Sequence, residues 1–312
     1  MTEHASHSCP PDGLAFTLEA ADGYALGARL WPQPAARQAA PVVIINAATS
    51  VQCRYYARFA AWLHAHGMHV LAYDYRGIGL SRPRRLRGFA ASWTDWGRLD
   101  FGAALDWALQ RFPGSPVDVV AHSFGGVAIG MAPFADRIRR AVTVGAQFAY
   151  WRDYDRRQRA AMLCKWHLAM PLVTRCLGYF PGKRLGWLED TPAGVVYDWT
   201  ARAPRYPDRP SARRLARQGI ELPFARVGAQ WLAISLADDP FGTPAATDRM
   251  LALYPGSERW HLRIAPADIG VPQIGHFAFF HARFQDTLWP LALQWLAGGA
   301  LAPGWPGRLA RP

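Results

Sequence analysis

Short, continuously apolar runs alternate along the chain with longer amphipathic stretches, and this alternation predicts strands separated by helices. Runs such as PVVIINA (41–47) and VDVVAH (117–122) lack a polar face, as expected of strands that are covered on both sides. Residues 55–67 place apolar side chains at helical spacing and end at a glycine. Strands alternating with helices indicate a mainly parallel sheet with helices on both faces. We expect its strands at 41–47, 68–75, 117–122, 140–146, 231–237 and 259–264.

The two ends of the chain follow other patterns. Residues 16–32 alternate around Asp22 and Gly23, which predicts a β-hairpin. Residues 280–297 have a helical pattern, and Pro290 is expected to kink that helix. The Gly- and Pro-rich tail, 298–312, is expected to be disordered.

Residues 149–227, between the fourth and fifth of these strands, do not continue the alternation of strands and helices. This segment is helical in places, has no clear buried strand and carries Trp151, Trp166, Trp187 and Trp199. Ligands of open α/β folds bind at the carboxyl ends of the strands, so an insertion at this point predicts a cap. The chain then divides into a first core part (1–148), a helical cap (149–227), a second core part (228–297) and the tail (298–312).

Ser123 stands where a predicted strand meets a predicted helix, in the stretch VDVVAHSFGG. A serine on such a turn, with small residues two before and two after it, is how a nucleophile elbow is built. Ala121 and Gly125 fill these two positions, although the usual first residue is glycine. The motif alone also fits an ordinary serine at the end of a buried strand.

Composition narrows the protein class. The length of 312 residues fits one large α/β domain with an insertion or two small domains, and the 51% hydrophobic and 19% charged residues are enough for a substantial core. Cysteines 9, 53, 164 and 176 form no CxxC pair or zinc spacing and are expected to be reduced thiols. The sequence shows no apolar leader at its start and no run of 18 apolar residues. We therefore expect a cytoplasmic protein without stable membrane insertion.

The net charge of +12 raises the question of nucleic-acid binding. Lys165 and Lys183 are the two lysines among 35 basic residues, and this arginine bias is typical of a GC-rich genome. No nucleic-acid-binding motif is present, so no nucleic-acid partner is expected. Acidic residues are interleaved with the arginines of the insertion, which predicts solvated arginines rather than steering of an anionic substrate.

Five motifs, in order, resemble those of the α/β-hydrolase superfamily, and within it the bacterial hydrolases grouped with the serine aminopeptidase and monoacylglycerol-lipase-like domain. They cover roughly residues 40 to 300. The motifs are NAATSVQCRYYARFA, YDYRGIGLS, AHSFGG, LADDPF and IGHFAFF. Within YDYRGIGLS, Asp74 and Arg76 are expected to stabilise the loop rather than react.

The resemblance implies a catalytic triad, because nucleophile, acid and histidine follow one another in this order in that superfamily. It points to Ser123 as nucleophile, Asp239 as acid and His276 as base. Asp238 remains an alternative acid. His281 is an alternative base, although it falls within the following helical pattern.

An oxyanion hole is the remaining requirement of that chemistry. The resemblance implies two backbone N–H donors, one at Phe124, directly after the nucleophile, and one in the loop after the strand at 41–46. The fold usually has His-Gly in that loop, and here Ala48 is the candidate donor. His122 is expected to point away from the nucleophile. The cluster His64, His66 and His69 is attributed to solvent exposure rather than to metal binding, and no metal or cofactor is expected.

These residues predict a serine hydrolase that cleaves a carboxylic ester of a small or medium apolar substrate. An acyltransferase, or an amidase or aminopeptidase, would use the same triad. A basic binding protein on a degenerate hydrolase fold is the non-enzymatic alternative. The small-molecule ester is the expected partner, and the sequence leaves the oligomeric state open.

Overall fold

The computed structural model describes residues 11–312, in which nine strands form one sheet of order β1-β2-β4-β3-β5-β6-β9-β10-β11. The strands are β1 (Leu14–Glu19), β2 (Ala25–Trp31), β3 (Val42–Asn46), β4 (His69–Tyr73), β5 (Val117–His122), β6 (Ile138–Val144), β9 (Gln230–Leu236), β10 (Glu258–Ile264) and β11 (Arg308–Ala310). From β4 to β10 all neighbours are parallel, whereas β1, β2 and β11 pair antiparallel at the edges. The predicted hairpin and the predicted parallel strands are confirmed.

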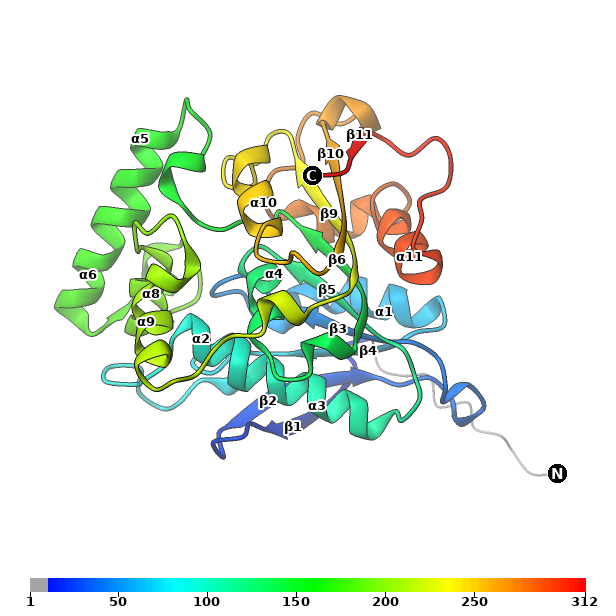
Figure 1. The fold of residues 1–312 in the computed structure, drawn as a ribbon, viewed down its shortest axis with the longest axis horizontal. Helices are drawn as coiled ribbons and strands as arrows, with labels where there is room; N and C mark the ends of the chain where they lie inside the picture. The colour runs from blue at the N-terminus through cyan, green and yellow to red at the C-terminus, as the bar shows by residue number, and fades with distance from the viewer. Residues whose placement is uncertain (1–10) are drawn as a thin grey trace.

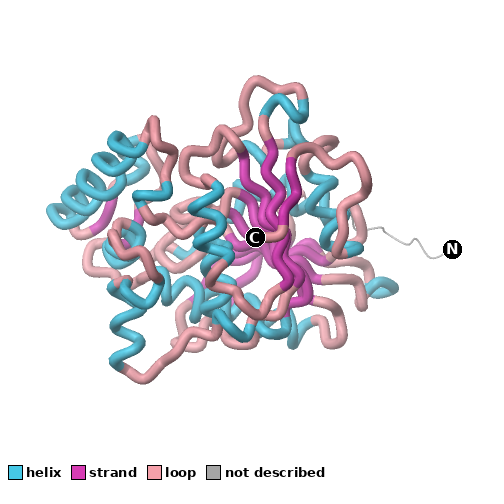
Figure 2. Tube along the Cα trace, turned by 45° about the horizontal axis from the view of Figure 1, so that its top comes forward, coloured by secondary structure: helices cyan, strands magenta, loops and turns pink. Residues whose placement is uncertain are grey.

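Helices cover both faces of this sheet (Figures 1 and 2). They are α1 (Ala57–Ala65), α3 (Gly102–Arg111), α4 (Phe124–Ala128), α10 (Pro244–Leu251) and α11 (Trp289–Gly298). α1 and α11 share one face, where the rings of Phe59 and Trp289 meet edge to face with centroids 5.2 Å apart. α3 packs on β1 through Trp107 and Phe16, whose centroids are 4.7 Å apart. The strands β3, β4 and β5 are buried between these layers along their whole length, including their polar residues Asn46, His69, Asp118 and His122.

The chain between β6 and β9, called here the insertion (residues 145–229), leaves the sheet and forms a separate helical group at the left of Figure 1. Its helices are α5 (Arg159–Met162), a π-helical turn (Leu163–Ala169), α6 (Met170–Leu177), α7 (Gly182–Leu185), α8 (Ala193–Trp199) and α9 (Pro210–Arg217). Two-residue strands, β7 (Tyr179–Phe180) and β8 (Thr191–Pro192), pair within it. The insertion is therefore mainly helical.

Two predictions for the C-terminal region differ from the structure. α11 begins at Trp289 with Pro290 in its first turn, where the missing N–H costs nothing, so the proline starts the helix instead of kinking it. The tail 298–312 is not disordered throughout, because Arg308–Ala310 form β11 along β10. No helix within residues 11–312 combines the length and the apolarity needed to cross a bilayer.

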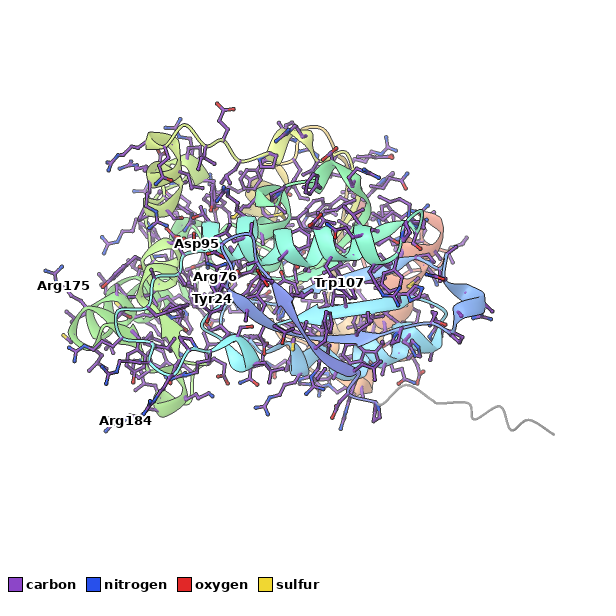
Figure 3. All side chains as sticks on the ribbon, turned by 90° about the horizontal axis from the view of Figure 1, so that it is seen from below. Tyr24, Arg76, Asp95, Trp107, Arg175 and Arg184 are labelled. Carbon is purple, nitrogen blue, oxygen red and sulfur yellow. The ribbon has the colours of Figure 1, made fainter. Side chains whose placement is uncertain are left out.

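The YDYRGIGLS loop is held by its own charged residues. Arg76 forms ion pairs with Asp22 and Asp100, both at 2.6 Å, and its guanidinium lies 5.0 Å from the ring of Tyr24 (Figure 3). Asp74 accepts hydrogen bonds from the N–H groups of Cys53 (2.6 Å) and Leu80 (2.7 Å). These contacts give both residues of the motif a structural role, as predicted.

Candidate active site

Ser123 occupies a sharp turn between β5 and α4. Its backbone has φ 53° and ψ −121°, a region that a residue with a side chain rarely adopts. The N–H of Ser123 donates to the carbonyl of Val144 on the neighbouring strand at 3.0 Å, which fixes the turn to the sheet. The local geometry is that of the predicted elbow.

The small residues after Ser123 are required by close packing. A Cβ atom at Gly125 would lie 2.5 Å from the carbonyl oxygen of Asn46, and one at Gly126 would lie 2.7 Å from Cβ of Ala146. Real Cβ atoms do not approach other atoms so closely. Gly125 therefore lets the end of β3 lie directly against the start of α4, and Gly126 does the same for the chain that follows β6.

His276 and Asp239 are joined by a hydrogen bond of 2.6 Å between Nδ1 and Oδ2. Asp239 follows β9, its side chain is fully buried, and its other oxygen accepts from the N–H of Phe241 at 2.8 Å. Because a carboxylate accepts, Nδ1 of His276 carries the proton and Nε2 is left as the basic nitrogen. Gly145 (φ 55°) leaves room for the pair, since a Cβ there would lie 3.0 Å from Asp239 Oδ2.

Asp238 has a different position. Its Oδ2 accepts from the N–H groups of Ile274 (2.8 Å) and Gly275 (2.9 Å), the two residues before His276. The carboxylate therefore holds the loop that carries the histidine. Of the two alternatives, the structure brings Asp239 to the imidazole.

Ser123 and His276 line one cavity. Within residues 11–312, no hydrogen bond joins the Ser123 hydroxyl to His276; such contacts often tighten only when substrate binds. His281 is exposed and packs near Tyr55, with ring centroids 5.9 Å apart, and it does not line this cavity. The geometry thus brings together Ser123, His276 and Asp239 and leaves His281 outside.

His122, beside the nucleophile, links two loops of the site. Its Nε2 lies 2.9 Å from the carbonyl oxygen of His276, and its Nδ1 lies 2.8 Å from the hydroxyl of Tyr56. A carbonyl only accepts, so Nε2 carries the proton and Nδ1 accepts from the tyrosine. Burial, with the nearby His276 adding to it, lowers the pKa of His122 well below its usual value, which keeps the ring neutral.

The hydroxyl of Tyr56 also fixes the direction of the backbone N–H of Ala48. The N–H of Ala48 donates to the Tyr56 hydroxyl at 2.9 Å, inside the protein. The predicted oxyanion donor at Ala48 is therefore already engaged in this structure. In residues 11–312 no backbone acceptor pairs with the N–H of Thr49 or with that of Phe124, and both residues line the cavity.

The cavity measures about 230 Å³ and lies between the sheet and the insertion. Aromatic side chains from both parts line it, among them Trp93, Trp166, Trp187, Trp199, Phe241 and Phe277. Trp166 and Trp199 also stack on each other with centroids 5.1 Å apart, so these indoles both pack the insertion and form the cavity wall. Trp151 does not line the cavity.

Sequence reasoning missed several of these residues. Tyr56 is an ordinary core position in a helical pattern, and nothing in the sequence pairs it with His122. Lys165 and Trp93 also line the cavity, and both positions depend on how the insertion packs. The rarity of lysine in this chain was the one signal that could have singled out Lys165.

The histidines near the end of α1 are held by separate contacts in the structure. No group of three or more potential metal ligands is found in residues 11–312. His69 is buried rather than exposed, and its Nδ1 accepts from the N–H of Gln33 at 3.0 Å. His64 hydrogen-bonds the carbonyl of Pro32 at 3.0 Å.

Comparison with known proteins shows the family of the chain. Residues 37–219, more than half of the chain, match the family described as serine aminopeptidase, S33. The comparison with curated proteins gives no match.

Solved structures share the fold at low identity. A soluble variant of monoglyceride lipase from Saccharomyces cerevisiae has a TM-score of 0.65 at 14% identity, covering 97% of this chain and 100% of that one. Mouse alpha/beta hydrolase domain-containing protein 10 has a TM-score of 0.56 at 11% identity, covering 92% of this chain and 100% of that one. An esterase from Pyrococcus furiosus has a TM-score of 0.53 at 14% identity, covering 91% of this chain and 90% of that one.

Proposed function

The chain belongs to the serine aminopeptidase S33 family of α/β-hydrolases, and from this premise we propose that it hydrolyses a carboxylic ester through a covalent acyl-enzyme on Ser123. The observation that carries the proposal is one cavity lined by Ser123, on its strained turn, and by His276, whose Nδ1 is held by Asp239. Serine needs such a base because its hydroxyl is a weak nucleophile at its own pKa.

In the proposed reaction, the Ser123 oxygen attacks the ester carbonyl while Nε2 of His276 takes its proton. The tetrahedral intermediate collapses, the C–O bond to the alcohol breaks, and His276 returns the proton to the leaving alkoxide. Water then attacks the acyl-enzyme with the same histidine as base, which releases the acid and restores the serine. Asp239 stabilises the imidazolium and holds its tautomer in both half-reactions.

The negative oxygen of the intermediate needs two donors. We assign them to the backbone N–H groups of Phe124, at the start of α4, and of Thr49. Thr49 replaces Ala48 in this role because the Ala48 N–H is bonded to Tyr56. Such donors stabilise the transition state when they are fixed in advance, and the close contact of Gly125 with the loop after β3 supports a fixed arrangement.

The lining of the cavity favours a small or medium apolar group on the substrate. Its volume of about 230 Å³ is below the range of ~300–1,000 Å³ common for drug-sized ligands, and its walls are mostly aromatic. An ester is favoured over a peptide because esters are the easier bonds to cleave. The printed names of the structural neighbours, a monoglyceride lipase and an esterase, agree with this choice.

A fluorophosphonate probe and a panel of substrates test the proposal. We expect the probe to label Ser123 in the parent and not in Ser123→Ala, and 4-nitrophenyl esters to be cleaved faster than aminoacyl anilides. Preference for the anilides would identify an amidase, and acyl transfer to an added alcohol in place of water would identify a transferase. If Ser123→Ala keeps activity within about tenfold of the parent, the nucleophile is another residue.

A further inference from the structure

Lys165 places a positive charge in the wall of the same cavity. It belongs to the π-helical turn of the insertion and lines the cavity together with Ser123. Its ammonium nitrogen lies 4.1 Å from the ring centroid of Trp187 and 4.6 Å from that of Trp166. Both indoles line the cavity as well, so the cation sits at an aromatic surface that faces the substrate.

No acidic side chain neutralises this charge. Within residues 11–312, Lys165 makes no ion pair, and no aspartate or glutamate lines the cavity. Three acids of the insertion have other partners. Glu189 pairs with Lys183 (2.8 Å), Asp190 with Arg82 (2.9 Å), and Asp198 accepts from backbone N–H groups.

The other basic residues of the insertion are placed differently. Arg175 and Arg184 are exposed and extend from its outer side into solvent (Figure 3). No arginine lines the cavity in the described part of the chain. Among the described residues, Lys165 is therefore the one lysine or arginine in the cavity wall; the buried Arg209 does not line the cavity, although its guanidinium lies 5.0 Å from the ring of Trp93.

An ammonium group in an apolar wall has a clear ligand preference. The two indole faces stabilise the cation but accept no conventional hydrogen bond, so its N–H donors remain available. A charge-assisted hydrogen bond to an anion is strengthened where aromatic walls exclude water. One ammonium without an arginine fits a carboxylate, whereas a phosphate usually gathers an arginine or several donors.

We propose that Lys165 binds a carboxylate on the substrate, so that the ester cleaved at Ser123 carries an anionic group at the far end of its apolar part. This inference rests on the proposed ester hydrolysis. It gives Lys165 the role of a specificity-determining residue that contacts substrate but takes no part in bond breaking.

Matched ester pairs test the inference. Mono-4-nitrophenyl esters of glutaric, adipic and suberic acid are compared with the corresponding ω-carboxamides, which have nearly the same shape and no charge. The enzymes are the parent, Lys165→Met, Lys165→Arg and Lys183→Met. Lys183 is the matched control, because it is the other lysine of the insertion, its side chain is 52% exposed, and it does not line the cavity.

The readout is the ratio of kcat/KM for each acid to that for its amide, after subtraction of the uncatalysed rate. In the parent this ratio should exceed one at one chain length, which reports the distance from Ser123 to Lys165. Lys165→Met should lower the ratio about ten- to hundredfold, mainly through KM, because a hydrogen bond to a charged group is lost. Lys165→Arg should restore part of it, and Lys183→Met should leave it unchanged.

Two results would overturn the inference and leave the proposed function intact. One is an unchanged ratio in Lys165→Met because both substrates slow equally, as a purely structural lysine predicts. The other is an equal fall in Lys183→Met, which would indicate long-range attraction. Absence of turnover for every ester, together with absence of probe labelling at Ser123, would instead overturn the proposed hydrolase function and this inference with it.

Discussion

Exchanging each carboxylate of the Asp238–Asp239 pair for an amide separates orientation of the imidazole from support of its loop. In Asp239→Asn, the amide oxygen can keep the N–H of Phe241, and its NH₂ then faces Nδ1 of His276. That nitrogen must become an acceptor, so the proton moves to Nε2. Nε2 can then no longer accept the proton of the Ser123 hydroxyl. A wrong tautomer of this kind costs about 10⁴ in kcat in the serine proteases, or about 5.5 kcal/mol.

Asp238→Asn changes much less. One oxygen of Asp238, Oδ2, accepts both N–H groups of the His276 loop, and an amide oxygen can do the same. The other oxygen, Oδ1, is buried and has no hydrogen-bond partner in residues 11–312, so an NH₂ in its place breaks no bond. We expect a loss in kcat below about tenfold, because only the charge of the acceptor is removed.

Steady-state hydrolysis of 4-nitrophenyl acetate at about pH 8 measures both variants against the parent. Thermal unfolding of each variant checks that the fold is retained. The expected order is a very large loss for Asp239→Asn and a small one for Asp238→Asn. The reverse order would make Asp238 the triad acid, and losses below about tenfold for both would refute imidazole orientation by either carboxylate.

Three further predictions concern the surroundings of the site. Gly125→Ala should lower the unfolding free energy by about 1–3 kcal/mol and activity by at least tenfold, because its Cβ meets backbone 2.5 Å away; parent-like melting and rates would contradict this. Tyr56→Phe leaves the Ala48 N–H and Nδ1 of His122 buried without partners, so the unfolding free energy measured in urea should fall by about 2 kcal/mol or more. An unchanged unfolding free energy would contradict the role given to the Tyr56 hydroxyl. Burial lowers the pKa of His167 to about 4, so the unfolded chain binds more protons below about pH 6.5 and stability should fall by about 3 kcal/mol as pH drops to 4. The same pH series on His167→Gln should give a shallower fall, and an identical one would assign the acid sensitivity to other groups.

Much of the core follows from local sequence. Predominantly apolar runs predicted β3, β4 and β5, and small residues around Ser123 predicted the turn, because these features depend on neighbours in the chain. The pairing of His276 with Asp239 needed the order of motifs as well. Parallel strands end at one edge of the sheet, so Asp239 in the loop after β9 and His276 in the loop after β10 can meet there.

Other features depend on contacts that no local pattern encodes. The direction of the Ala48 N–H is set by Tyr56, which is bonded in turn to His122 on another strand. The position of Lys165 results from packing of insertion helices against the sheet. β11 has three residues between loops, too few to give a periodic signal.

The three-residue strand β11 also changes how the sheet meets other molecules. Without it, the outer side of β10 would present unpaired backbone groups at His261 and Arg263, where another chain could add a strand. β11 covers this edge and is itself short; it begins at the exposed Arg308, and Arg311, which follows it, pairs with Glu258 at 3.0 Å. Its own free side therefore offers an incoming strand only three residues, one of which is the exposed Arg308. We therefore expect β11 to hinder edge-to-edge aggregation through β10. Removing residues 308–312 should lower the solubility of the protein more than its catalytic rate.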